Sequence, residues 1–335
     1  MTPKLVRIGY IGAGKFSRSR ILPALKSIPG VVLQQICNNT SDSTDRVAKE
    51  FGFHETAKSW HDVATSSEID ALIVGTHANL HSEICLAALD AGKHILTINA
   101  ISQTLQEAVE MDTSAKNKPT LVTLVYPGQY YLREDAMMKQ VLIEQLIGQV
   151  IQVAVYWNTP FFGLGSQFEV ARRWFGDHKS VYAYRTNFSE HSAGYDHSGG
   201  ARRMQVNVVV AKAINDVTIT YLHNNIAIPT NLARFEIYGT DGMLTCYSFG
   251  QSKEGFWLGK VDNQETLEIP VPTALKANWD YPEASIPDEK EFIDNILGNS
   301  TASAAIPRFE DGVKLMEFTE VWRQSLDTGQ TQTIS

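Results

Sequence analysis

The clearest chemical signal in this chain is a glycine motif close to its N-terminus. Residues 8–17 read Ile-Gly-Tyr-Ile-Gly-Ala-Gly-Lys-Phe-Ser, a Gly-x-Gly-x-x-Ser pattern. Gly12 permits a tight turn, and Gly14 lets the backbone approach a pyrophosphate at the N-terminus of the following helix. Ser17, in the third position, is small enough for close helix–strand packing. The pattern therefore predicts a dinucleotide site built from a strand, a turn and a helix.

The place expected to meet the ribose carries amides and hydroxyls. Dehydrogenases that prefer NAD usually have Asp or Glu at the end of the second strand, about 20 residues past the glycines. Here the chain reads Cys37-Asn38-Asn39-Thr40-Ser41. No carboxylate stands there to repel a 2′-phosphate, so the sequence slightly favours NADP, although these side chains are compatible with NAD.

Tyr126 is a candidate proton donor. It ends the last predicted strand of the first domain, and Gln129 and Tyr130 follow it. The carboxyl ends of parallel strands open onto the ligand crevice of such sheets. A tyrosine there can give a proton to a carbonyl or imine that is being reduced, or it can pack in the core. The sequence leaves both interpretations open.

The densest ionisable cluster contains Glu190, His191, Tyr195, Asp196 and His197. A histidine titrates near neutral pH and an adjacent carboxylate can hold its tautomer, so His197 is a second candidate proton donor. The alternative is a polar loop that contacts a neighbouring subunit.

The remaining motifs point away from other chemistries. His77 and His81 are four residues apart, but no Asp, Glu or Cys stands at matching spacing, so no metal site is predicted. The chain contains no P-loop and no Gly-x-Ser-x-Gly elbow, so no motif supports a kinase or hydrolase.

Alternating strands and helices must position the glycine motif. Helices are predicted most clearly over Asn79–Ala91 and Thr104–Asn117. Strands that alternate with helices of about 10–15 residues indicate βαβ units and a doubly wound parallel sheet. Its buried strands are expected at Val6–Ile11, Val31–Cys37, Ile69–Gly75, His94–Ile98 and Thr120–Val125.

Beyond residue 126 few long helices separate the strands, which favours an antiparallel sheet. Asp241-Gly242 predicts a hairpin turn, and Ser189–Arg203 has no periodicity and is predicted to be a long loop. Helices are expected at Leu132–Gln145, Asp288–Leu297 and Phe309–Ser325. Strands are expected at Val150–Trp157, Val181–Asn187, Val217–Leu222, Arg234–Tyr238 and Met243–Tyr247.

These patterns predict an α/β Rossmann domain over residues 1–126. An α+β domain with an open, mostly antiparallel sheet is predicted over residues 127–335.

Composition limits the possible partners. Of the 335 residues, 29 are Lys or Arg and 37 are Asp or Glu, a formal net charge of −8. This balance argues against a general nucleic-acid or anionic-membrane binder. No apolar run approaches the roughly 20 residues of a membrane span, and the N-terminus lacks the apolar core of a signal peptide. Three dispersed cysteines, Cys37, Cys85 and Cys246, suit a reducing compartment, so a cytoplasmic location is predicted.

Taken together, the motifs make the chain similar to the glucose–fructose oxidoreductase, inositol dehydrogenase and MocA family over nearly its whole length. The shared motifs are the Gly12-Ala13-Gly14 turn, residues 48–52 (Ala-Lys-Glu-Phe-Gly), residues 69–76 (Ile-Asp-Ala-Leu-Ile-Val-Gly-Thr), His81, residues 91–96 (Ala-Gly-Lys-His-Ile-Leu), residues 235–242 (Phe-Glu-Ile-Tyr-Gly-Thr-Asp-Gly) and residues 325–329 (Ser-Leu-Asp-Thr-Gly). The resemblance implies a second domain that binds substrate and forms a homodimer or homotetramer through its sheet.

The resemblance also assigns cofactor contacts, with NADP or NAD as the cofactor. The residues predicted to bind it are Gly12, Gly14, Lys15, Phe16, Asn38, Asn39, Thr40, Thr76, His81 and Asn99.

Two departures from the family pattern concern proton transfer. The family typically carries Glu-Lys-Pro after the fifth strand, with the lysine beside the nicotinamide, but here that lysine position is Asn99 and the proline position is Ala100. The family's Asp, His and Asp positions align with Phe162, Ser166 and Glu169. An amide cannot take up a proton, and loss of a general base costs about 10²–10⁴-fold in rate.

Two functions remain open. The first is an NAD(P)-dependent oxidoreductase that acts on a small carbonyl, imine or sugar-like substrate with a non-standard proton donor. Its predicted catalytic residues are Tyr126 and His197, and its predicted substrate-binding residues are Asn99, Gln129 and Tyr130. The alternative is a catalytically silent regulatory protein that senses a cofactor or sugar on the same fold.

Overall fold

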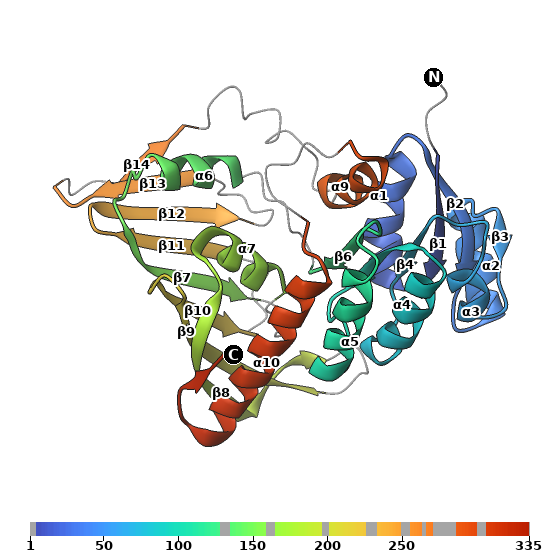
Figure 1. The fold of residues 1–335 in the computed structure, drawn as a ribbon. Coiled ribbons are helices and arrows are strands. Elements are labelled where there is room, and N and C mark those ends of the chain that lie inside the picture. Colours follow the sequence, from blue (N-terminus) through green and yellow to red (C-terminus); the bar gives the residue numbers. More distant parts are fainter. Residues whose placement is uncertain are drawn as a thin grey trace. The chain divides into compact units, whose positions relative to one another are not determined.

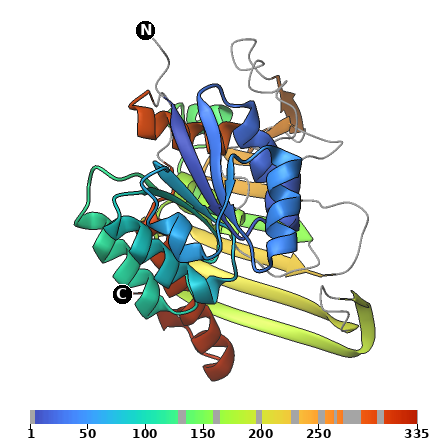
Figure 2. The ribbon, with the colours of Figure 1, turned by 90° about the vertical axis from the view of Figure 1, so that its right-hand side faces the viewer.

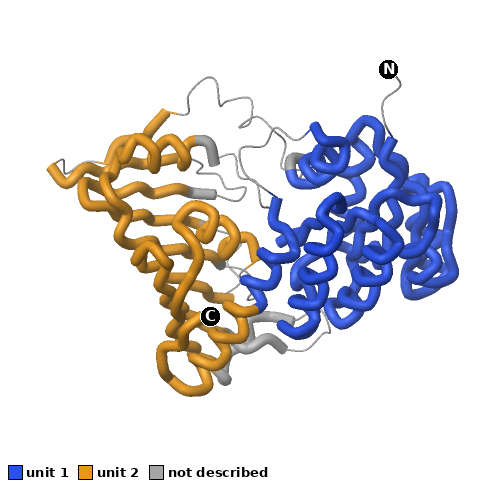
Figure 3. Tube along the Cα trace, in the orientation of Figure 1, with its two compact units in different colours: residues 1–130, 284–316 blue, residues 131–283, 317–335 orange. Residues whose placement is uncertain are grey.

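The computed structural model describes residues 5–127, 135–158, 165–195, 201–225, 233–248, 255–262, 266–270, 286–299 and 306–334. The chain forms two compact units (Figure 3). Unit 1 contains residues 1–130 and 284–316, and unit 2 contains residues 131–283 and 317–335. The return of residues 284–316 to unit 1 differs from a simple division of the chain after residue 126.

Unit 1 is built on a parallel sheet, as the alternation of strands and helices predicts (Figure 1). In the described part of the chain the strand order is β3-β2-β1-β4-β5-β6. The order reverses direction between β1 and β4, which is where open α/β sheets bind ligands. The strands are β1 (Val6–Ile11), β2 (Val31–Cys37), β3 (Glu55–Thr56), β4 (Ala71–Val74), β5 (His94–Ile98) and β6 (Thr123–Tyr126).

Helices cover both faces of this sheet. The blue and the teal helices of Figure 2 lie on opposite sides of it. On one side α3, α4 and α5 pack on a core that includes Ile11, Leu72, Ile84 and Met111. The helical segments of unit 1 are η1 (Ser17–Ile21), α1 (Leu22–Ser27), α2 (Ser41–Phe51), α3 (Trp60–Ala64), η2 (Ala78–Leu80), α4 (His81–Asp90), α5 (Leu105–Lys116) and α9 (Ile286–Leu297).

Local sequence explains where these helices begin. The Thr104 hydroxyl accepts a hydrogen bond from the Glu107 backbone N–H, and the Glu107 carboxylate accepts one from the Thr104 N–H. Ser59 and Asp62 form the same reciprocal cap at α3. Such caps satisfy two of the N–H groups that a helix start leaves unpaired.

Unit 2 carries the mostly antiparallel sheet that was predicted. Among described residues its order is β14-β13-β12-β11-β7-β10-β9-β8-β15, and only the β7–β10 pair is parallel. The strands are β7 (Val150–Asn158), β8 (His178–Tyr195), β9 (Ala201–Ala213), β10 (Thr218–Asn224), β11 (Ala233–Gly239), β12 (Gly242–Ser248), β13 (Gly255–Lys260), β14 (Thr266–Ile269) and β15 (Gln332–Thr333).

The predicted long loop over Ser189–Arg203 is wrong. Strand β8 continues to Tyr195 and β9 begins at Ala201, so most of this segment belongs to the long ribbon drawn in yellow-green in Figure 2. Ser192 pairs with Arg203, and the register shifts on both sides of Ser192. These irregularities break the alternation that usually reveals a strand.

Unit 2 also contains helices in its described part. They are α6 (Asp135–Ile143), α7 (Gly165–Phe175) and the C-terminal part of α10 (Phe309–Thr328), which begins in unit 1. Phe168 of α7 and Phe318 of α10 lie 4.8 Å apart between ring centroids and are buried. No described helix is long and apolar enough to cross a membrane.

Candidate dinucleotide site

The turn after β1 requires glycine at residue 12 for reasons within the protein. Gly12 has φ +81°, and a Cβ added there would lie 2.7 Å from Thr76 Cγ2 and 2.8 Å from the Thr76 nitrogen. The Gly12 N–H donates to the Cys37 carbonyl at the end of β2 over 3.0 Å. The turn is therefore wedged between the ends of β2 and β4.

Gly14, unlike Gly12, has open space where a side chain would be. A Cβ added at Gly14 would meet no protein atom within 4 Å, and its φ is not in the left-handed region. Neither steric contact nor a left-handed φ explains a glycine at this position within the described residues. The following helical segment runs from Lys15 through η1 into α1, and its first N–H groups have no partner inside the helix. Open space over Gly14 beside these N–H groups fits the pyrophosphate of a dinucleotide.

Close packing holds the start of this helix against the sheet. A Cβ added at Gly75 would lie 2.8 Å from the Gly12 carbonyl oxygen and 2.9 Å from Ser17 Oγ. Ser17 is only 2% exposed. Small residues at 12, 17 and 75 thus allow the helix to begin directly above the strand ends.

Asn38 lies at the end of β2, and both polar atoms of its side chain form hydrogen bonds within the protein. Its Oδ1 accepts a hydrogen bond from the Ala13 N–H over 2.7 Å, and its Nδ2 donates to Ser43 Oγ over 3.1 Å. Asn39 and Thr40 are exposed, and the Thr40 hydroxyl caps α2. Asn38 therefore positions the glycine turn, while its neighbours face solvent.

Asn99 lies at the end of β5. Its backbone N–H donates to the Tyr126 carbonyl over 2.8 Å, and the peptide bond between Asn99 and Ala100 is cis. Within the described residues the half-buried Asn99 amide has no hydrogen-bond partner. This side chain is free to bind a substrate oxygen or a nicotinamide carboxamide.

His81 joins the loops that follow β4 and β5. It is 1% exposed, its Nε2 lies 2.9 Å from the Thr76 carbonyl oxygen, and its Nδ1 lies 2.9 Å from the Ala100 carbonyl oxygen. Burial lowers the pKa of His81, and its bonds to these carbonyls oppose that shift. The geometry is that of a residue that positions the Ala100 loop.

Residues of the helix that follows the glycine motif contact the Tyr126 side chain. Its phenol oxygen accepts a hydrogen bond from Arg20 Nε over 2.9 Å, and its ring centroid lies 6.0 Å from that of Phe16. Tyr126 is 1% exposed and Phe16 is 44% exposed. Arg20 was missed by the sequence analysis, because no motif spacing links it to Tyr126.

The remaining predicted site residues lie outside this geometry. Gln129, Tyr130 and His197 are outside the described residues, as is Phe162. Lys15 is exposed on the first turn after the glycines. No group of three or more His, Cys, Asp or Glu able to hold a metal ion occurs in the described ranges.

Residues 6–126 match the model of the GFO_IDH_MocA family, described as an oxidoreductase family with an NAD-binding Rossmann fold. The match spans all six strands of the parallel sheet of unit 1. Its glycine turn, open Gly14 and free helix N–H groups are the features that hold NAD or NADP in such a domain.

Curated relatives extend the comparison. The chain is 29% identical to 1,5-anhydro-D-fructose reductase of Ensifer adhaerens over 153 residues, which are 45% of this chain and 44% of the reductase. It is 21% identical to the NADP(+)-dependent scyllo-inositol 2-dehydrogenase of Bacillus subtilis over 81% of this chain and 76% of that enzyme. The match to the reductase thus spans less than half of that protein.

Solved structures show the same fold over the whole chain. A levoglucosan dehydrogenase in complex with NADH and levoglucosan has a TM-score of 0.81 at 19% identity, over 99% of this chain and 100% of that chain. At this identity the likeness concerns the fold alone.

Unit 2 contains a buried ion-pair group at the end of α7. Glu169 is 2% exposed and pairs with Arg172 at 2.9 Å. Arg172 also pairs with Asp177 at 2.9 Å. Next to them, buried His178 lies 2.8 Å from the Tyr221 hydroxyl, and burial lowers the pKa of His178 to about 3. This group joins α7 to the sheet.

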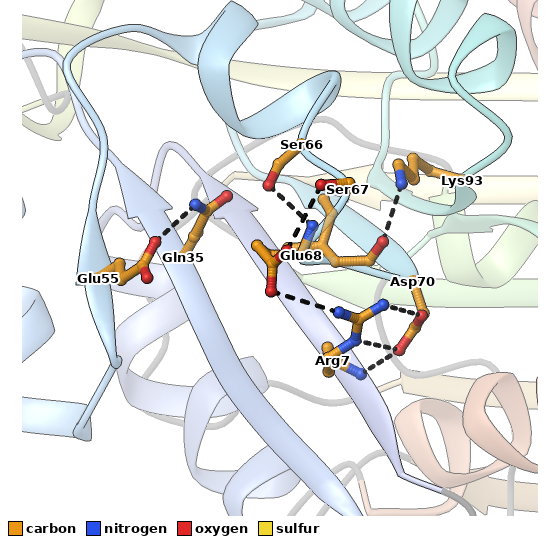
Figure 4. Close-up of polar contacts among 9 residues, drawn as sticks. Arg7, Gln35, Glu55, Ser66, Ser67, Glu68, Asp70 and Lys93 are labelled. Atoms are coloured by element: carbon orange, nitrogen blue, oxygen red, sulfur yellow. Dashed lines mark hydrogen bonds and ion pairs between the residues drawn. The ribbon is translucent and has the colours of Figure 1, made fainter.

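A charged cluster lies at the N-terminal ends of the central strands of the unit 1 sheet (Figure 4). Arg7 donates through Nε and Nη2 to the two oxygens of Asp70, over 3.1 and 2.8 Å, and Glu68 lies 3.7 Å from Arg7. The ammonium of Lys93, which is 8% exposed, donates to the Ile69 carbonyl over 2.9 Å. This cluster ties β1 to the segment before β4 and lies at the strand N-termini, away from the ligand edge.

Proposed function

We propose that this protein is an NAD(P)-dependent oxidoreductase that reduces a small carbonyl, imine or sugar-like substrate. The observation that carries the proposal is the open space at Gly14 beside unpaired helix N–H groups, in a domain of an NAD-binding oxidoreductase family. Relatives that are named reductases and dehydrogenases of sugars and inositols support the substrate class.

Tyr126 and Asn99 are the residues to which we assign the reaction. A bound reduced dinucleotide would supply the hydride for the carbonyl or imine carbon. In this proposal the Tyr126 hydroxyl donates the proton that the substrate oxygen or nitrogen gains. The Tyr126 oxygen accepts a bond from the Arg20 cation, which stabilises the phenolate left after proton transfer. The Asn99 amide binds the substrate oxygen or the nicotinamide carboxamide.

NADP is the preferred cofactor in this proposal. Asn38 holds the glycine turn without a carboxylate, so no negative charge faces a 2′-phosphate at the end of β2. Exposed Asn39 and Thr40 supply polar contacts to the ribose end.

The test begins with fluorescence titration of NADH and NADPH against the whole protein. Reduced-nicotinamide absorbance is then followed with a panel of ketones, 2-oxo acids, imines and ketoses. Turnover that falls at least tenfold in Tyr126→Phe and in Asn99→Ala supports the assignment. Failure to bind either dinucleotide would overturn it, and binding without turnover across the panel favours a cofactor-sensing regulatory protein.

We also propose that unit 2 forms a homodimer through its sheet. Tyr182, Tyr184 and Phe188 point to one face of β8 and are 41%, 58% and 46% exposed. Val208 pairs with Tyr184 and adds to the same face. Such an apolar face is typical of a protein interface. Light scattering should give twice the chain mass for the wild type and one chain mass for Tyr184→Glu, and a monomeric wild type would contradict the proposal.

We keep the prediction of a cytoplasmic location. All three cysteines are buried and none forms a disulfide in the described part of the chain, which supports a reducing compartment.

A further inference from the structure

Nε and Nη2 of an arginine donate hydrogen bonds along the same edge of the guanidinium. Two arginines of the helix that follows the glycine motif differ in the acceptors that they have along this edge. In Arg18 this edge is complete, because Glu50 Oε2 accepts from Nε over 3.0 Å and from Nη2 over 2.7 Å. In Arg20 only Nε is used, by the Tyr126 phenol at 2.9 Å. Arg20 Nη2 is buried and has no hydrogen-bond partner.

Within the described residues, this arrangement leaves the Nη2 of Arg20 without an acceptor. No carboxylate forms an ion pair with Arg20 in the part of the chain that the structure describes, and Arg20 is half-buried. A buried N–H without an acceptor costs about 1–3 kcal/mol, and more on a charged group. Arg7 shows the usual solution in this unit, since both oxygens of Asp70 fill the same edge.

The buried, unpartnered Nη2 of Arg20 is next to the Nε that binds Tyr126, at the carboxyl end of β6. Tyr126 ends β6 and packs near Phe16, and its carbonyl holds the backbone of Asn99. An acceptor bound to Nη2 would be a direct neighbour of the Tyr126 oxygen, because Nε and Nη2 share one side of the guanidinium.

We propose that Arg20 binds a carboxylate of the substrate, and that the reacting carbonyl is next to that carboxylate, as in a 2-oxo acid. The inference rests on the proposed function. A carboxylate oxygen on Nη2 completes the edge and pairs the cation, and a desolvated guanidinium binds carboxylates more strongly than an exposed one. The adjacent carbonyl oxygen then lies beside the Tyr126 hydroxyl. Hydride addition to its carbon and the Tyr126 proton give the 2-hydroxy acid and the oxidised dinucleotide.

The decisive experiment measures binding as well as turnover. Pyruvate, 2-oxoglutarate and 2-oxogluconate are titrated calorimetrically against the protein, with fructose as the neutral probe. The variants are Arg20→Gln, Arg20→Lys and, as a matched control on the same helix, Arg18→Gln. Circular dichroism verifies that each variant is folded.

We expect at least one 2-oxo acid to bind the wild type more tightly than fructose. Arg20→Gln should weaken that binding at least 30-fold, Arg20→Lys should recover part of it, and Arg18→Gln should change it less than threefold. Tyr126→Phe should retain carboxylate binding while losing turnover. These results together would assign the carboxylate to Arg20.

Four results would overturn the inference. The first two are equal 2-oxo acid binding in Arg20→Gln and wild type, and no binding of any 2-oxo acid. The third is a loss of NADPH affinity in Arg20→Gln while substrate binding is unchanged, because Arg20 would then bind a cofactor phosphate. The fourth is efficient turnover of neutral ketoses alone, which would refute the carboxylate contact but leave the proposed function standing. Carboxylate binding without dinucleotide binding would refute the proposed function instead.

Discussion

Replacing the two glycines of the turn separately tests whether the space over Gly14 belongs to a ligand. In Gly14→Ala the new methyl meets no protein atom within 4 Å, and the backbone conformation is one that alanine adopts. Folding stability should stay the same or rise by about 0.4–1 kcal/mol, because alanine restricts the unfolded chain. In the proposed binding mode, the same methyl occupies the space that the pyrophosphate needs. Dinucleotide affinity should therefore fall about tenfold or more, equivalent to about 1.4 kcal/mol.

Gly12→Ala is the matched contrast. The left-handed φ of +81° costs about 1–2 kcal/mol for alanine. The contact of 2.7 Å with Thr76 forces a backbone shift that adds about 1–3 kcal/mol. The melting temperature should fall by roughly 5–15 °C from this total. Gly12→Ala is thus expected to damage the fold, and Gly14→Ala only binding.

Fluorescence titration with NADPH and thermal melting without ligand measure the two effects independently. Gly52→Ala, another glycine with a left-handed φ and open surroundings, controls for backbone strain away from the site. The reasoning is refuted if Gly14→Ala binds NADPH as tightly as the wild type. It is also refuted if Gly14→Ala unfolds as early as Gly12→Ala, because the protein itself would then require that glycine.

Three further predictions concern charge. Asn38→Asp keeps an oxygen for the Ala13 N–H but adds a negative charge, so NADPH affinity should fall about tenfold or more in titration while NADH affinity changes little. Burial opposes ionisation of Asp70, but hydrogen bonds from Arg7 outweigh it and lower the pKa of Asp70, so its stabilisation is lost only as pH falls through that lowered value. Asp70→Asn should cost about 1 kcal/mol in denaturant melts at neutral pH, and less in acid. Burial lowers the pKa of His178 to about 3, so the unfolded state binds the extra proton between that value and about 6.5, and stability falls as pH falls through this window. His178→Gln should flatten that part of the pH–stability profile, and an unchanged slope would contradict the assignment.

Several of these elements follow from local sequence because their causes are local. The bounds of β1, β2 and β5 agree with the predicted strands, since continuous β-branched runs between helices have few alternatives. The caps at Ser59 and Thr104 need only residues three apart. The glycine turn likewise needs only the order of strand, turn and helix.

Other features depend on contacts between distant segments. The return of residues 284–316 to unit 1 left no local signal, because amphipathic helices such as α9 can pack on either unit. The predicted strand Val181–Asn187 lies within β8, but its continuation to Tyr195 was not predicted, because the register shifts there hide the strand period. Pairing of strands is a property of two segments, whereas periodicity is read from one.

The sequence by itself determined that this chain has a Gly-x-Gly turn between a strand and a helix, and an asparagine at residue 99. Only the tertiary structure decided what surrounds that position. It brings Arg20 to Tyr126 across 106 residues of chain, and it commits Asn38 to the glycine turn. Side-chain chemistry can be read from residue types, but which groups satisfy each other depends on how the strand ends converge. Arg20, with half of its hydrogen-bonding edge unfilled, could be found only there.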